Sequence, residues 1–226
     1  QILINGLKCQ ECGRCAGICP AGAIQYRRFD DQMFFEFFRT FPLKKKSIVV
    51  FGSEKELHSF WWHHHGTTFD NHLFLEYPCT SALSALHLIS LLAHGASQVI
   101  ILKAESDDKP FAQKTIDQVN RLVETVFDTS SRVTATTIQG YLSPDPGSED
   151  SALLPKDYTD LNYINRRQKL SSILEHAVSN LDKTVTVQND EDTLFHSILC
   201  REDACTQCLA CLNECKIQAL SADPSS

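Results

Sequence analysis

The chain has 226 residues, 42% hydrophobic and 22% charged, with 28 acidic and 21 basic residues and a formal net charge of −7. These values are ordinary for a globular protein of one large domain or two small ones. The acidic balance argues against a nucleic-acid partner. Membrane insertion is not expected, because no apolar run reaches the ~20 residues of a membrane helix.

Cysteines are the most informative residues of the chain. Eight of the ten lie in two short runs, one near each end, which indicates metal chemistry in a reducing compartment rather than a disulfide framework. We therefore expect a cytoplasmic protein, which a partner can also hold at a membrane. The chain starts at Gln1 with neither an initiator Met nor a signal peptide, so we expect a processed or truncated N-terminus.

The first run, CQECGRCAGICP, places Cys9, Cys12, Cys15 and Cys19 in the spacing C-x2-C-x2-C-x3-C. Three thiolates at i, i+3 and i+6 on a tight loop can cover three irons of one cubane, and the fourth opens a short helix that points away. Small residues between the cysteines let backbone N–H groups approach the sulfurs. Zinc and disulfides explain the run less well, because zinc favours separated ligand pairs and cysteines three apart bridge poorly.

Residues 29–46 follow, and their first part, Phe29 to Phe41, holds six of the 13 phenylalanines of the chain. The spacing of these rings predicts a helix with a broad apolar face. Two roles stay open for it. It is either a core helix that connects the cysteine run to the next domain or a docking surface for a larger redox subunit.

Residues 47–185 alternate between strand and helix patterns. Near-continuous apolar segments predict strands buried on both faces, at residues 47–52, 72–77, 98–104 and 133–139. Helix patterns follow these segments. The first begins at Ser53, which forms a capping box with Glu56, and the others span about residues 81–94, 108–127 and 160–181. Residues 142–155 have the composition of a loop. The alternation predicts an α/β fold with a small parallel doubly wound sheet.

Other candidate sites in this region are weaker. Cys79 follows a strand and precedes a helix, so it is either a reactive thiolate or a buried small residue at a strand end. Residues 51–58 contain no phosphate loop, so a flavin is not expected. The three histidines of residues 61–66 point about 100° apart on a helix and do not converge on one ion, which favours a helix C-terminus.

The second run, CTQCLACLNECK, repeats the spacing of the first with Cys205, Cys208, Cys211 and Cys215. The alignment continues beyond the fourth cysteine, with CPAGAI matched by CKIQAL. The two runs therefore form an internal repeat. Cys200 lies just before the second run, in an expected strand, where we interpret it as a core residue or a shield for a cluster.

The two runs resemble a bacterial-type two-cluster ferredoxin. This resemblance implies two [4Fe–4S] clusters with exchanged fourth ligands. The first cluster takes Cys9, Cys12, Cys15 and Cys215, and the second takes Cys205, Cys208, Cys211 and Cys19. Residues 1–28 and 194–222 then form two halves of one ferredoxin-like α+β domain, with the sheet inserted between them. Lys216 stands where the family usually has Pro, which removes no ligand. Alternatively, each run pairs with a ferredoxin half on sequence missing from this chain.

The middle of the chain resembles the delta subunit of methyl-viologen-reducing hydrogenase, and ferredoxin-fused relatives in formate dehydrogenase and heterodisulfide reductase systems. The segments VVFGSEKEL, EYPCTSALSALHLISLLAHGASQVIIL and NRRQKLSSILEHAV carry this resemblance. It implies a subunit that relays electrons or docks within an electron-transfer complex. The hydrogenase subunit holds a cysteine-bound cluster in this domain, whereas here only Cys79 occupies a matching place, so a third cluster is not expected.

These patterns predict an iron–sulfur electron-transfer protein or oxidoreductase subunit that relays single electrons through two [4Fe–4S] clusters. We expect no catalytic residue, and redox enzyme subunits as partners that dock through Phe29 to Phe41. Two alternatives remain. The first is a redox enzyme that uses Cys79 or a flavin in the α/β domain, and the second is an assembly factor whose clusters only stabilise the fold.

Overall fold

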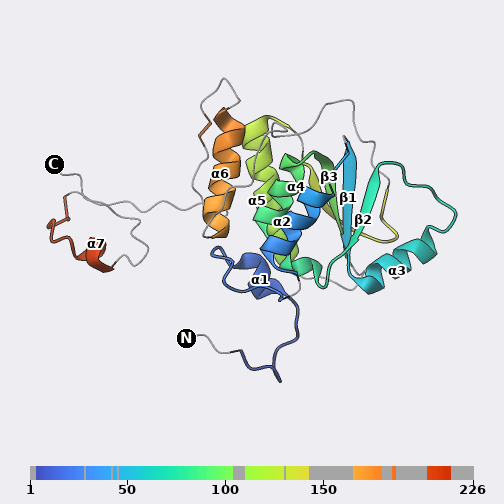
Figure 1. Cartoon of the computed structure of the whole chain (residues 1–226), viewed down its shortest axis with the longest axis horizontal. Coiled ribbons are helices and arrows are strands. Elements are labelled where there is room, and N and C mark those ends of the chain that lie inside the picture. Colours follow the sequence, from blue (N-terminus) through green and yellow to red (C-terminus); the bar gives the residue numbers. More distant parts are fainter. Residues whose placement is uncertain are drawn as a thin grey trace. The chain divides into compact units, whose positions relative to one another are not determined.

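The computed structural model describes residues 4–27, 29–41, 43–44, 46–103, 110–129, 131–142, 165–179, 185–186 and 203–214. Contacts divide the chain into two compact units, Gln1–Leu194 and Phe195–Ser226. The first unit contains the sheet and the first cysteine run, and the second contains the second run (Figure 1).

The first unit is built on a parallel sheet with strand order β2-β1-β3-β4 among the described residues. The strands are β1 (Ser47–Gly52), β2 (His72–Glu76), β3 (Ala96–Lys103) and β4 (Val133–Thr137). Every neighbouring pair is parallel. Every residue of β1 is buried, because this strand is central and covered on both faces. The four predicted strands and the α/β class are confirmed.

Helices lie on both faces of this sheet (Figure 1). The helices of the first unit are α1 (Arg14–Ile18), α2 (Asp31–Thr40), α3 (Glu54–His63), the short 3₁₀ helix η1 (Thr80–Ala82), α4 (Ala85–Ala93), α5 (Pro110–Phe127) and α6 (Arg166–Ser179). α3 packs on one face, whereas α4 and α5 pack on the other. The second unit contains α7 (Ala210–Glu214). None of the described helices is long and apolar enough to cross a membrane.

Capping residues define the start of α3. The Ser53 backbone N–H donates to the Glu56 carboxylate at 2.7 Å, and the Glu56 N–H donates to the Ser53 hydroxyl at 3.4 Å. This arrangement is the capping box expected from the sequence. It satisfies donors that a helix N-terminus otherwise leaves without partners.

The structure corrects the start of the helix predicted at residues 81–94. η1 and α4 are separate, because Ser84 between them is extended and caps α4. The Ser84 N–H donates to Nδ1 of His87, so a histidine serves where a capping box usually has Glu. The helix ends before Gly95, as expected, and the φ of 105° at this residue suits glycine.

The last predicted helix, at residues 160–181, is confirmed where the structure describes it, as α6. Leu170, Ile173 and Ala177 on its expected apolar stripe are buried. Residues 160–164 and 180–181 lie outside the described residues, as do the expected loop from residue 143 on and the expected strand near Cys200.

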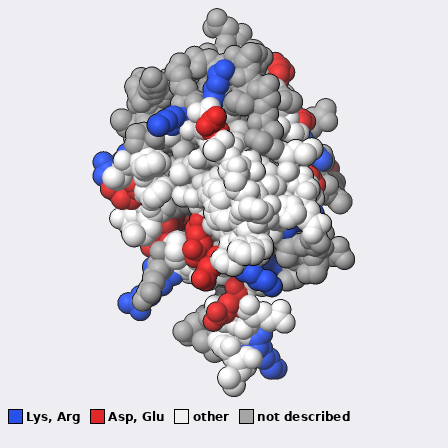
Figure 2. Space-filling view, turned by 90° about the vertical axis from the view of Figure 1, so that its right-hand side faces the viewer, with Lys and Arg blue, Asp and Glu red and all other residues white. Residues whose placement is uncertain are grey.

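The C-terminal end of α3 carries the histidines of residues 61–66. α3 ends at His63, which confirms the helix terminus expected there. The next two histidines contact main-chain oxygens, with His64 Nε2 3.1 Å from the carbonyl oxygen of Ile138 and His65 Nδ1 3.0 Å from that of Trp62. Trp62 is exposed, and this side of the molecule has a broad area without charged side chains (Figure 2).

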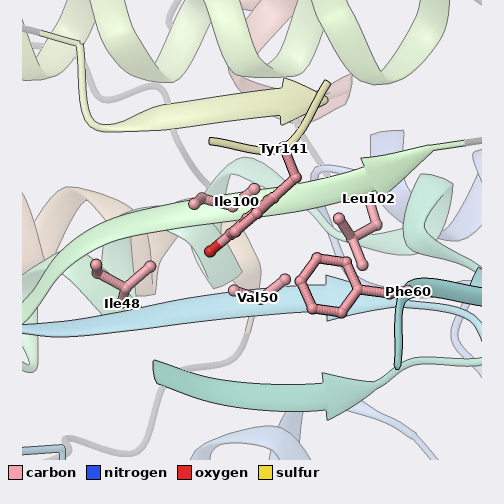
Figure 3. Packing of buried hydrophobic residues seen from close by; sticks show 6 residues of the cluster. All are labelled: Ile48, Val50, Phe60, Ile100, Leu102 and Tyr141. Atoms are coloured by element: carbon pink, nitrogen blue, oxygen red, sulfur yellow. The ribbon is translucent and has the colours of Figure 1, made fainter. Parts of the chain in front are cut away.

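The core under α3 consists of side chains from β1 and β3 covered by two aromatic rings (Figure 3). Its fully or almost fully buried members are Ile48, Val50, Phe60, Ile100, Leu102 and Tyr141. The rings of Phe60 and Tyr141 meet edge to face at 5.0 Å between centroids. The Tyr141 hydroxyl is buried and has no hydrogen-bond partner among the described residues.

We expect Tyr141→Phe to raise the free energy of unfolding by about 1 kcal/mol, because a buried hydroxyl without a partner costs roughly that much or more. Urea unfolding of the two proteins under anaerobic conditions measures the difference. A loss of stability in the variant would contradict this view of the core, since it would mean that the hydroxyl has a partner.

Candidate metal centre

The two cysteine runs have the same backbone conformation at corresponding positions. Between the first and second cysteines, Glu11 has a φ of 52° and its counterpart Gln207 also has 52°. After the second cysteine, Gly13 has a φ of 69° and its counterpart Leu209 has 57°. Residues other than glycine seldom adopt this left-handed conformation. Its recurrence at both positions makes the sequence repeat a structural repeat.

The repeat extends into the short helices that follow. α1 and α7 begin at corresponding residues, two positions after the second cysteine of each run. Matching backbone hydrogen bonds open the two helices: Ala16 and Gly17 donate to the Gly13 carbonyl at 2.9 and 3.0 Å, and Leu212 and Asn213 donate to the Leu209 carbonyl at 3.1 and 3.3 Å. Each run therefore presents its first two cysteines on the same type of loop and its third in the short helix that follows. In the first run, Cys19 comes directly after this helix.

The structure describes seven of the eight predicted ligands, all as free thiols. Cys12 and Cys19 are partly buried, and the others are exposed, namely Cys9, Cys15, Cys205, Cys208 and Cys211. Cys215 lies outside the described residues, so the predicted exchange of ligands between the runs stays a prediction. Within the described part of the chain, no three His, Cys, Asp or Glu side chains are grouped closely enough to hold a metal ion.

Backbone donors favour the thiolate form at two of these cysteines. Burial raises the pKa of Cys19, but backbone N–H groups of residues 21 to 24 outweigh it and hold this pKa below its usual value. The backbone N–H of Ala210 and the Thr206 hydroxyl lower the pKa of Cys208. Because the thiolate is the form that binds metal, both environments suit a cysteine ligand. The donor set and the loops therefore fit an iron–sulfur cluster.

Comparison with known families agrees with this geometry. Residues 2–25 match the family model of the 4Fe-4S binding domain. The N-terminal segment is a ferredoxin-type iron–sulfur module, and the match supports a role in iron–sulfur electron transfer. No curated protein and no solved structure matched the chain. The resemblance of the middle domain to a hydrogenase delta subunit stays a prediction.

This iron–sulfur module packs on the connection between β2 and α4, at the carboxyl end of the parallel sheet. α1 lies against η1, and two glycines permit the close approach. A Cβ at Gly17 would overlap the carbonyl oxygen of Ser81, and one at Gly13 would lie 2.8 Å from the Cβ of Ala82. The small residues noted in the first run therefore also serve the contact between the module and the sheet domain.

Cys79 lies beside the first run, which nothing in the sequence indicated. Its side chain is partly buried, and its Sγ donates to the carbonyl oxygen of Cys12 at 2.9 Å. Tyr26 belongs to the same neighbourhood, because its hydroxyl donates to the Glu11 carbonyl at 2.7 Å. Burial raises the pKa of Tyr26 to about 12. Cys79 is therefore a neighbour of the predicted ligands. Both roles predicted for it, a structural residue and a reactive thiolate, stay open.

A buried polar network ties the module to three helices. Arg166 Nε and Nη2 donate to the Asp31 carboxylate at 2.6 and 2.7 Å. His87 Nε2 lies 2.9 Å from the same carboxylate. Arg166 Nη1 donates to the carbonyl oxygen of Ala16 and, at 3.4 Å, to that of Cys19. Nothing in the sequence indicated this network, whose members come from α2, α4 and α6.

The hydrogen bonds of the network fix its charges. Because the Ser84 N–H donates to Nδ1 of His87, the ring proton sits on Nε2 and is donated to Asp31. Burial lowers the pKa of His87 despite its bond to Asp31, so the imidazole is neutral. Burial raises the pKa of Asp31, but hydrogen bonds from His87 and Arg166 outweigh it and hold this pKa well below its usual range. The network therefore combines a neutral imidazole, a carboxylate and a guanidinium.

The aromatic helix α2 serves the core with one side and exposes the other. Phe34 and Phe38 are buried, whereas Met33, Phe37 and Phe41 are about half exposed. An apolar groove of about 240 Å³ lies between α2 and the edge strand β2. The core role expected for Phe29 to Phe41 is therefore confirmed for two of its rings, and the exposed rings leave the docking role as a prediction.

We expect Gly17→Ala to destabilise the chain by about 1–3 kcal/mol, the usual range for overpacking a tight contact, because the new methyl group would push α1 away from η1. Gly6→Ala is the matched control, since a Cβ at Gly6 meets nothing within 4 Å. Thermal melts of the three proteins measure the effect. Equal melting temperatures for both variants would contradict the close contact.

The network also predicts a pH dependence. The unfolded chain protonates His87 below about pH 6.5, whereas the folded chain keeps it neutral, so acid favours unfolding. Between pH 8 and pH 6 we expect this residue to reduce the free energy of unfolding by up to about 0.8 kcal/mol. Urea titrations of the wild type and His87→Gln at both pH values measure it, with exposed His63→Gln as the control. If the free energy of unfolding of His87→Gln changes between pH 8 and pH 6 by as much as that of the wild type, the neutral buried imidazole is contradicted.

Proposed function

We propose that the chain is an electron-transfer protein that binds two [4Fe–4S] clusters and relays single electrons within a larger redox complex. One observation carries this proposal. The second cysteine run repeats both the spacing and the left-handed backbone positions of the first run, which is the run that matches the 4Fe-4S binding domain. The same cysteine spacing and the same backbone conformation support binding of a [4Fe–4S] cluster by both runs.

The ligand sets follow the ferredoxin resemblance. Cys9, Cys12 and Cys15 would hold one cluster with Cys215, and Cys205, Cys208 and Cys211 would hold the other with Cys19. The position of Cys19 supports this assignment, because the residue follows directly after α1 in an extended conformation. Cys215 follows α7 in the same way along the sequence.

When bound, such clusters accept and donate one electron at a time. The residues of this chain contribute the thiolate charge, the backbone N–H groups of residues 21 to 24 near Cys19, and a rigid platform for the first run. Hydrogen bonds to the sulfurs and burial tune the potential of a cluster. The chain would then set the reduction potentials of the clusters, and a partner would carry out the chemistry on a substrate.

The partner would be a redox enzyme subunit that docks on the exposed side of α2. The half-exposed rings of Phe37 and Phe41, together with Met33, form an apolar surface of the kind that protein interfaces use. The resemblance of the middle domain favours a complex of the formate dehydrogenase or hydrogenase type. The formal net charge of −7, to which two oxidised clusters with their thiolates add about −4, favours a partner with a basic docking face.

The iron content of single-cysteine variants tests the two-cluster proposal. We expect Cys12→Ala and Cys208→Ala each to retain about four iron atoms per chain, half of the about eight in the wild type, because each removes one ligand of a different cluster. Iron and acid-labile sulfide are measured after anaerobic purification. Cys79→Ser is the control and should retain about eight, since it keeps a donor for the Cys12 carbonyl.

The outcome for Cys208→Ala is the decisive one. Iron content equal to that of the wild type in this variant would contradict a cluster in the second run. A fall to about four iron atoms in Cys79→Ser, as in the ligand variants, would contradict the ligand sets, because it would indicate that Cys79 is a ligand.

A further inference from the structure

The contact between Arg166 and the first cysteine run is more specific than packing requires. Arg166 is only 6% exposed and directs Nη1 at the carbonyl oxygens of Ala16 and Cys19. The next residue of α6, Arg167, donates its backbone N–H to the carbonyl of Pro20 at 3.2 Å. The start of α6 therefore holds the main chain on both sides of Cys19.

The charged groups of the network are joined by hydrogen bonds that start at the carbonyl oxygen of this cysteine. The Arg166 guanidinium faces the Cys19 carbonyl with Nη1 and the Asp31 carboxylate with Nε and Nη2. The positive group therefore contacts the Cys19 main chain directly, and the negative group is bound to the positive group. The neutral His87 imidazole follows beyond Asp31. Because Arg166 and Asp31 are both largely shielded from solvent, their fields are screened less than those of surface charges.

We propose that Arg166 is a positioning residue for Cys19 and that the oriented Arg166–Asp31 pair sets the reduction potential of the cluster bound by this cysteine. The inference rests on the proposed function. Reduction adds one negative charge to a cluster, so a nearby positive group raises the potential and a nearby negative group lowers it.

A buried ion pair is weak evidence for a purely stabilising role, because desolvation offsets most of its attraction. The orientation of the pair toward a ligand-bearing main chain is what a tuning role requires. A tuning role also makes opposite predictions for the two partners, which a structural role does not. Removal of the positive group must lower the potential, whereas removal of the negative group must raise it.

Redox titrations of the holoprotein, followed by EPR at pH 8, test this inference. We expect the potential of one cluster to become more negative in Arg166→Met and more positive in Asp31→Asn. Arg166→Lys keeps the positive charge, so its cluster potential should lie between those of the wild type and Arg166→Met. Arg167→Met is the matched control, because it removes the exposed neighbouring guanidinium and keeps the backbone bond to Pro20, and its potentials should equal those of the wild type.

Shifts of Arg166→Met and Asp31→Asn in the same direction, or no shift in either while iron content is retained, would overturn the inference. If Arg166→Met does not fold, the other two variants decide. Asp31→Asn keeps the guanidinium of Arg166, and Arg166→Lys keeps a positive charge at this position. A wild type that lacks two reducible clusters would instead refute the proposed function, so the two failures are distinguishable.

Discussion

The carboxylate of Asp31 is the point on which the arrangement of the first unit depends. It begins α2, accepts from Arg166 at the start of α6 and accepts from His87 within α4, while Arg166 continues to the main chain of Ala16 and Cys19. A buried charge is tolerated only when it is paired and hydrogen-bonded, so the position of each helix is constrained by the others. Hydrogen bonds from the Arg166 side chain thereby attach the iron–sulfur module to the sheet domain.

The second constraint is the close contact of α1 with η1. It requires glycine at Gly13 and Gly17, whose counterparts in the second run are Leu209 and Asn213. Leu209 shares the left-handed backbone of Gly13 although it has a side chain, which means that this loop conformation does not require glycine. The two runs therefore share the ligand-bearing backbone, whereas the glycines of the first run serve its contact with η1.

Much of the fold could be predicted from the sequence, because its signals are local. Long apolar segments identified the four strands, and Ser53 with Glu56 identified the start of α3. The helix at residues 81–94 was predicted to start too early, because its apolar pattern runs through η1 and conceals the cap at Ser84. The network of Asp31, His87 and Arg166 could not be predicted, since its members are far apart in the sequence and each resembles an ordinary helix residue. Cys79 beside Cys12 was missed for the same reason.

The most direct test of two clusters is a count of iron and acid-labile sulfide per wild-type chain after anaerobic purification, followed by EPR after reduction with dithionite. We expect about eight of each and two interacting signals of reduced [4Fe–4S] clusters. Zinc without sulfide would contradict electron transfer by this chain. About four of each would leave one of the two matching loops without a cluster and contradict the equivalence of the two runs.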